Sequence, residues 1–168
     1  HELELPIKAC DDQIAQDERH VKEEEDQMKD LKDRIHHDAV KLKTTNDIIE
    51  SKKKLKAVEN KRLEDMHEIE MLKQKEERLI REKEKLRAHG IQTDADKQRQ
   101  RELELQIKAC DDRIAQDERH VKEEEDQIGR LKEKLADDEL VLADNEKQFH
   151  VVESAQETAV TATDNDMP

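Results

Sequence analysis

The stretch RAHGIQTDAD at residues 87–96 decides the fold, because it is the clearest interruption in a chain of helix-forming residues. Gly90 suits the left-handed conformation that follows many helix C-termini, and the apolar Ile91 comes directly after it. Thr93 is a good N-cap residue, since its hydroxyl can accept a hydrogen bond from the first turn of a helix. The sequence therefore predicts a long helix within residues 1–89, a turn at 90–93 and a second helix over residues 94–150.

The composition outside this stretch excludes an ordinary globular domain. Of 168 residues, 46% are charged and 32% hydrophobic, and there are only 2 Gly, 2 Pro and 1 Phe. A typical globular domain is nearly half apolar and about a quarter charged. The dominant residue types favour helix, so the sequence predicts an all-α, extended coiled coil.

Apolar residues recur every seven positions on both sides of the turn, which is typical of a coiled coil. After the turn, the a positions are Ile107, Ile114, Val121, Ile128, Leu135, Leu142 and Phe149. Near the start of the chain they are Ile7, Ile14, Val21, Met28, Ile35, Leu42 and Ile49. We expect the register to slip by one residue between positions 45 and 55, so that the interface continues through Ile48, Leu55, Arg62, Ile69, Leu72 and Leu79.

A repeat with an offset of 100 residues divides the charge into blocks. Residues 2–28 (the first copy) and 102–128 (the second copy) differ at 3 of 27 positions. The first copy has ten acidic and three basic residues, and the second copy has ten acidic and four basic residues. Residues 52–87 have nine acidic and thirteen basic residues. Folding back at the turn sets the second copy beside residues 55–81, so negative charge meets positive charge. An array of helical units and a single local duplication both explain the repeat.

This folding-back gives specific expectations for neighbouring side chains. We expect Ile114 to lie near Ile69 and Leu142 near Leu42. Arg62, which is unusual at an a position, should approach Val121 between two acidic d positions, Asp117 and Glu124.

The first copy is left without a partner in the same chain. A parallel in-register dimer would set Asp17 against Asp17 and Glu24 against Glu24, and burying like charges together is costly. We therefore expect a homo-oligomer, with an antiparallel dimer favoured, or pairing with another coiled-coil protein. An upstream repeat in a longer protein is the alternative explanation.

No catalytic, cofactor or metal site is predicted. Cys10 and Cys110 are each followed by two aspartates, which oppose thiolate formation, so both are expected to be small interface residues. The Asp-His-Glu triplets at 17, 20, 24 and at 117, 120, 124, like the His36–His37 pair, are assigned to a solvated polar face. Bundle metal sites need ligands from several facing helices.

These features favour a non-enzymatic structural or scaffold protein that assembles through its heptads and charge blocks. Two alternatives are a coiled-coil arm of a larger chromosome-associated or motor machine, and an acidic cation-binding matrix protein. The net charge of -14 disfavours direct nucleic-acid binding, and neither membrane association nor a small-molecule substrate is expected. Residues 151–168 lose the heptads and are expected to form an acidic, disordered tail. A cytoplasmic or nuclear location is expected from the cysteine usage.

Overall fold

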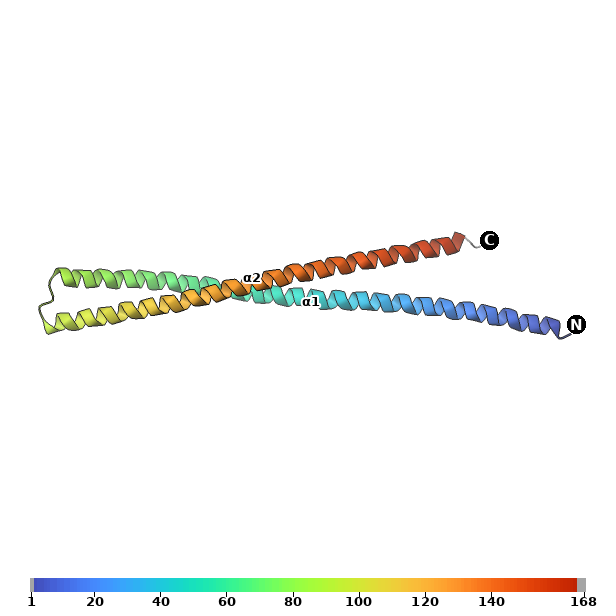
Figure 1. The fold of residues 1–168 in the computed structure, drawn as a ribbon, viewed down its shortest axis with the longest axis horizontal. Coiled ribbons are helices and arrows are strands. Elements are labelled where there is room, and N and C mark those ends of the chain that lie inside the picture. Colours follow the sequence, from blue (N-terminus) through green and yellow to red (C-terminus); the bar gives the residue numbers. More distant parts are fainter. Residues whose placement is uncertain (1, 166–168) are drawn as a thin grey trace. The chain divides into compact units, whose positions relative to one another are not determined.

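The chain folds as two long helices joined by a short turn (Figure 1). The computed structural model describes residues 2–165, with side chains at 2–151, 153 and 154. Helix α1 spans Glu4–Ala88 and helix α2 spans Asp94–Asn165, and no strand occurs among the described residues. The predicted all-α helical hairpin is therefore confirmed.

The turn has the geometry that its sequence predicts. Gly90 adopts a φ of +83°, and its N–H donates to the Arg87 carbonyl at 3.2 Å, which closes the end of α1. At the start of α2, the Asp96 N–H donates to Thr93 Oγ1 at 3.1 Å, and the Thr93 N–H donates back to Asp96 Oδ2 at 3.2 Å. These reciprocal bonds form a capping box. The N–H donors from Thr93 and Gln92 lower the pKa of the Asp96 carboxyl.

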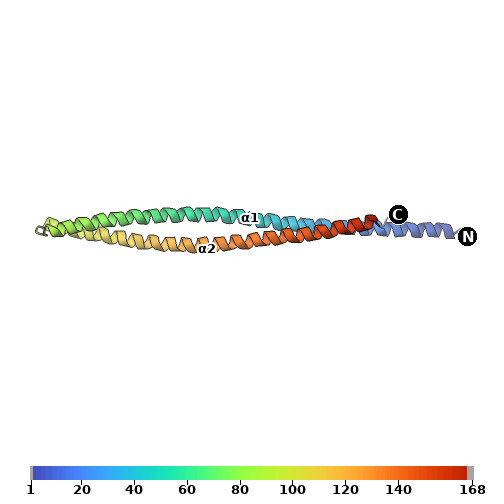
Figure 2. The same cartoon turned by 90° about the horizontal axis from the view of Figure 1, so that it is seen from above.

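The hairpin divides into two units, which are described separately. The turn unit, Ile49–Asp137, contains the turn and the parts of both helices next to it, which run away from it in opposite chain directions (Figure 2). Its buried cluster consists of Leu79, Leu103 and Cys110, with Leu86 and Ile107 packed against it. The terminal unit comprises the described residues within His1–Ile48 and Asp138–Pro168.

The end of α2 differs from the expectation of a disordered tail. The helix continues to Asn165, so residues 151–165 are helical. Between Gln148 and Asn165 the sequence contains neither glycine nor proline, and its alanines and glutamates support helix, so nothing in this stretch ends it. The expectation is wrong for 151–165, and its last three positions, 166–168, lie outside the described residues.

Candidate functional site

The turn unit has a continuous seam between α1 and α2 in which residues alternate at spacings of three and four. On α2, every a and d position from residue 103 to residue 135 is buried or half-buried, including the predicted Ile107, Ile114, Val121, Ile128 and Leu135. On α1, the predicted Leu55, Arg62, Ile69, Leu72 and Leu79 are likewise buried or half-buried. The heptads of these two segments therefore mark the face on which the helices pack.

Charged side chains join the basic stretch of α1 to the second copy along both sides of this seam. Arg62 donates to Glu125 Oε1 from Nε at 3.2 Å and from Nη2 at 3.1 Å. Lys83 Nζ lies 3.3 Å from Glu104 Oε1. Lys83 follows Arg62 by 21 residues and Glu104 precedes Glu125 by 21 residues, so both contacts have the same antiparallel register. The expected pairing of these charge blocks is confirmed. Arg62 is half-buried in the seam, and the contacts of its guanidinium are with Glu125.

Asp117 is a carboxylate at the centre of the seam. Its side chain is 2% exposed, and Arg113 Nε lies 3.5 Å from its Oδ1. The same Arg113 donates to Glu68 Oε1 of α1 at 3.2 Å, so one guanidinium serves carboxylates on both helices. Burial, followed by the nearby Glu68 carboxylate, raises the pKa of Asp117.

Asp65 of α1 and Glu124 of α2 form an acidic pair in the same seam. Asp65 Oδ1 accepts a hydrogen bond from Lys61 Nζ at 3.2 Å, while Asp65 Oδ2 and Glu124 Oε2 are buried without a conventional donor. A proton on the Glu124 carboxyl gives this pair the hydrogen-bond donor that two carboxylates lack. Burial, together with this hydrogen bond, raises the pKa of Glu124 to about 7, and the same bond lowers the pKa of Asp65. The heptads place Glu124 at a d position, but its pairing with Asp65 depends on the helix register and was not predicted from the sequence.

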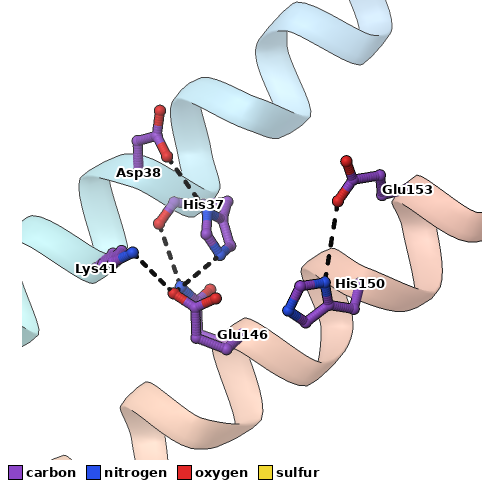
Figure 3. Close-up of polar contacts among 7 residues, drawn as sticks. His37, Asp38, Lys41, Glu146, His150 and Glu153 are labelled. Atoms are coloured by element: carbon purple, nitrogen blue, oxygen red, sulfur yellow. Dashed lines mark hydrogen bonds and ion pairs between the residues drawn. The ribbon is translucent and has the colours of Figure 1, made fainter.

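In the terminal unit, α1 and α2 meet around His37 (Figure 3). The imidazole is 9% exposed, and its centroid lies 4.1 Å from that of the predicted interface residue Phe149. Asn145 Nδ2 donates to the His37 carbonyl at 3.2 Å, and Lys41 Nζ lies 3.1 Å from Glu146 Oε1. The contact with Lys41 lowers the pKa of Glu146. The assignment of His37 to a solvated polar face is therefore wrong, because His37 is buried, as is Thr44 seven residues later.

The a positions near the start of the chain lie on an exposed face of α1. We call this set the first-copy stripe: Ile7, Ile14, Val21, Met28, Ile35, Leu42 and Ile49, all of which are exposed. Leu42 is 64% exposed, so the expectation that it lies near Leu142 is wrong. The expected register slip is also absent from the residues that α1 turns toward α2. In the terminal unit α1 turns His37, Thr44 and Ile48 inward, and these positions extend the seven-residue series of Ser51 and Leu55 without a slip.

The histidine and carboxylate patterns do not converge on a metal site. His120 is exposed, whereas Asp117 is buried, and His36 is exposed, whereas His37 is buried. Within residues 2–165, no group of three or more histidine, cysteine, aspartate or glutamate side chains is placed to hold a metal ion. Over the same residues, neither helix includes a segment apolar and long enough to cross a membrane.

Comparison with family models, curated proteins and solved structures finds no match to this chain. The assignment of function therefore depends on the seam and the exposed stripe.

Proposed function

We propose that this protein is a non-enzymatic coiled-coil structural protein whose function is self-association. The observation that carries the proposal is the exposure of the first-copy stripe. Seven apolar residues at consecutive heptad positions lie open along one helix, and Ile35 is as much as 67% exposed. Contiguous apolar surfaces of this kind mark interaction sites in proteins that otherwise have charged surfaces.

The second copy supports the proposal because it is nearly the same sequence in a packed state. Leu103 is fully buried and Ile114 is 8% exposed, whereas their counterparts Leu3 and Ile14 are exposed. A sequence that packs against a helix in one half of the chain is suited to pack against a helix in the other half. The free cysteines Cys10 and Cys110 fit a reducing compartment, which we propose to be the cytoplasm or nucleus.

Light scattering coupled to size exclusion tests the proposal. The chain has a mass of 19.8 kDa, and we expect the measured mass to rise toward a multiple of this value as concentration increases. The association should weaken with added salt, because screening reduces the attraction between exposed charge blocks. A monomeric mass at every concentration and ionic strength would overturn the proposal.

A further inference from the structure

The first-copy stripe and the residues of α1 that meet α2 in the terminal unit lie on different faces of α1. Leu42 is exposed, and Thr44, two residues later, is buried. Two residues correspond to about 200° around a helix of 3.6 residues per turn. Ile35 and His37 show the same contrast. A further helix can therefore pack on the stripe while α2 remains in place.

The charge along α1 identifies this helix. The first copy has ten acidic and three basic residues, a net charge of -7, whereas residues 29–56 have five acidic and nine basic residues, a net charge of +4. The stripe passes through both segments, from Ile7 to Ile49. A second α1 in the antiparallel direction sets each acidic segment on a basic one, and a parallel one sets like charge on like charge.

We propose that residues 2–56 of α1 pair antiparallel with the same residues of a second copy of this chain, about a two-fold axis close to Met28 and Leu31. This inference rests on the proposed self-association and specifies its partner, direction and register. The basic residues 55–81 of a second chain are a weaker alternative, because the seam of that segment is already covered by the second copy of its own chain.

The register follows from the hairpin itself. There, His37 and Thr44 belong to the series of Ser51, which are the d positions when Ile48 and Leu55 are a positions. Such d positions lie level with a positions of α2, as in the contact of His37 with Phe149. Applied to the dimer, this rule sets Met28 level with the partner subunit's Leu31, and Ile49 level with the partner subunit's Cys10.

The same register brings acidic residues of the first copy to basic residues of the other subunit. Glu125 and Glu118 of the second copy meet Arg62 and Lys73 in the turn unit. Their first-copy counterparts are Glu25 and Glu18. In the dimer, Glu25 comes level with the partner subunit's Arg34, and Glu18 comes close to the level of the partner subunit's Lys43. The first copy thus repeats, between subunits, the charge pairing that the second copy makes within one chain.

Oxidative crosslinking of the full chain tests the register. In a Cys110→Ser background, the substitution Ile49→Cys should give a covalent dimer whose disulfide joins Cys10 of one subunit to position 49 of the other. Cys110→Ser alone should give almost none, because Cys10 of one subunit then lies far from Cys10 of the other. Peptide mass spectrometry identifies the linkage. A Cys10–Cys10 linkage would show a parallel dimer and overturn this inference while leaving self-association intact; a monomer by light scattering would overturn both.

A pair of substitutions tests the surface without crosslinking. Leu42→Asp places a charge on the stripe at the level of the partner subunit's Asp17, and should raise the dimer Kd by about tenfold or more. Leu63→Asp is the control, since Leu63 is equally exposed on α1 but lies outside residues 2–56. Equal effects of the two substitutions on Kd would contradict the proposed interface.

Discussion

Cys110 is buried in the seam between α1 and α2, whereas Cys10, its counterpart in the first copy, is exposed on α1. Both cysteines are preceded by alanine and followed by two aspartates, so their local sequences are the same. The difference between them therefore arises from tertiary packing. In several other pairs of residues 100 positions apart, the second-copy residue is buried and the first-copy residue is exposed. Each such pair provides a substitution with a matched control in the same molecule.

The two cysteines should react differently with a thiol-specific reagent. In dilute native protein we expect Cys10 to be modified roughly tenfold or more faster than Cys110, because Cys110 becomes accessible only when the helices open. Mass spectrometry of the two peptides measures both rates in one sample. In denaturant the rates should become equal, and equal rates in the native protein would contradict the burial of Cys110.

Truncation of Leu103 should destabilise the hairpin strongly. Leu103 is fully buried in the cluster with Leu79 and Cys110, so Leu103→Ala should lower the free energy of unfolding by about 2–5 kcal/mol. Leu3→Ala removes the same atoms from an exposed position and should change it by less than about 0.5 kcal/mol. Thermal unfolding followed by circular dichroism at low protein concentration measures both. Similar losses in the two variants would show that the copies are not packed differently.

The two glycines should respond to alanine in opposite directions. Gly90 has a φ of +83°, so Gly90→Ala should destabilise the turn by about 1–2 kcal/mol through backbone strain. Gly129 lies within α2, and a Cβ added there meets no atom within 4 Å, so Gly129→Ala should stabilise the helix by about 0.5–1 kcal/mol. Denaturant titration measures the change in the free energy of unfolding in both variants. A gain in stability from Gly90→Ala would exclude the left-handed conformation.

The stability of the hairpin should fall as pH rises from about 4.5 to about 7. The pKa of Glu124 is about 7 in the folded chain and 4.5 in its ordinary state, so the folded state holds the proton more tightly. Its stabilising effect is complete below pH 4.5 and is lost as pH rises through 7. The raised pKa of Asp117 acts in the same direction. The lowered pKa of Asp65 acts oppositely, because its contribution is present above its ordinary value of 3.8 and is lost at lower pH.

Two substitutions isolate the contribution of Glu124. Glu124→Gln keeps a donor toward Asp65 at every pH, so the variant should lose much of the fall in Tm between pH 5 and 8 and should be more stable than the parent chain at pH 8. Glu24→Gln alters the exposed counterpart and, at a protein concentration low enough to keep the chain monomeric, should leave the pH dependence of Tm unchanged. Unchanged pH dependence in Glu124→Gln would contradict the shared proton.

Local sequence determined the helices and the turn. The scarcity of glycine and proline, the heptads after the turn, and the Gly90 and Thr93 signals act through neighbouring residues along the chain, so α1, the turn and the start of α2 follow from them. The alternation of charge also indicated the antiparallel pairing of residues 55–81 with the second copy, because charge blocks of this length tolerate an error of a few residues in register.

Tertiary structure alone decided which face of α1 is covered in the terminal unit. The first-copy stripe has a more regular apolar pattern than the series containing His37 and Thr44, yet α2 packs on the latter. The side chains that α1 buries there are His37, Thr44 and Ile48, two of them polar, so local apolarity alone does not decide which face is covered. Register also brought Glu124 to Asp65, because a carboxyl–carboxyl contact depends on the placement of two helices to within a single turn.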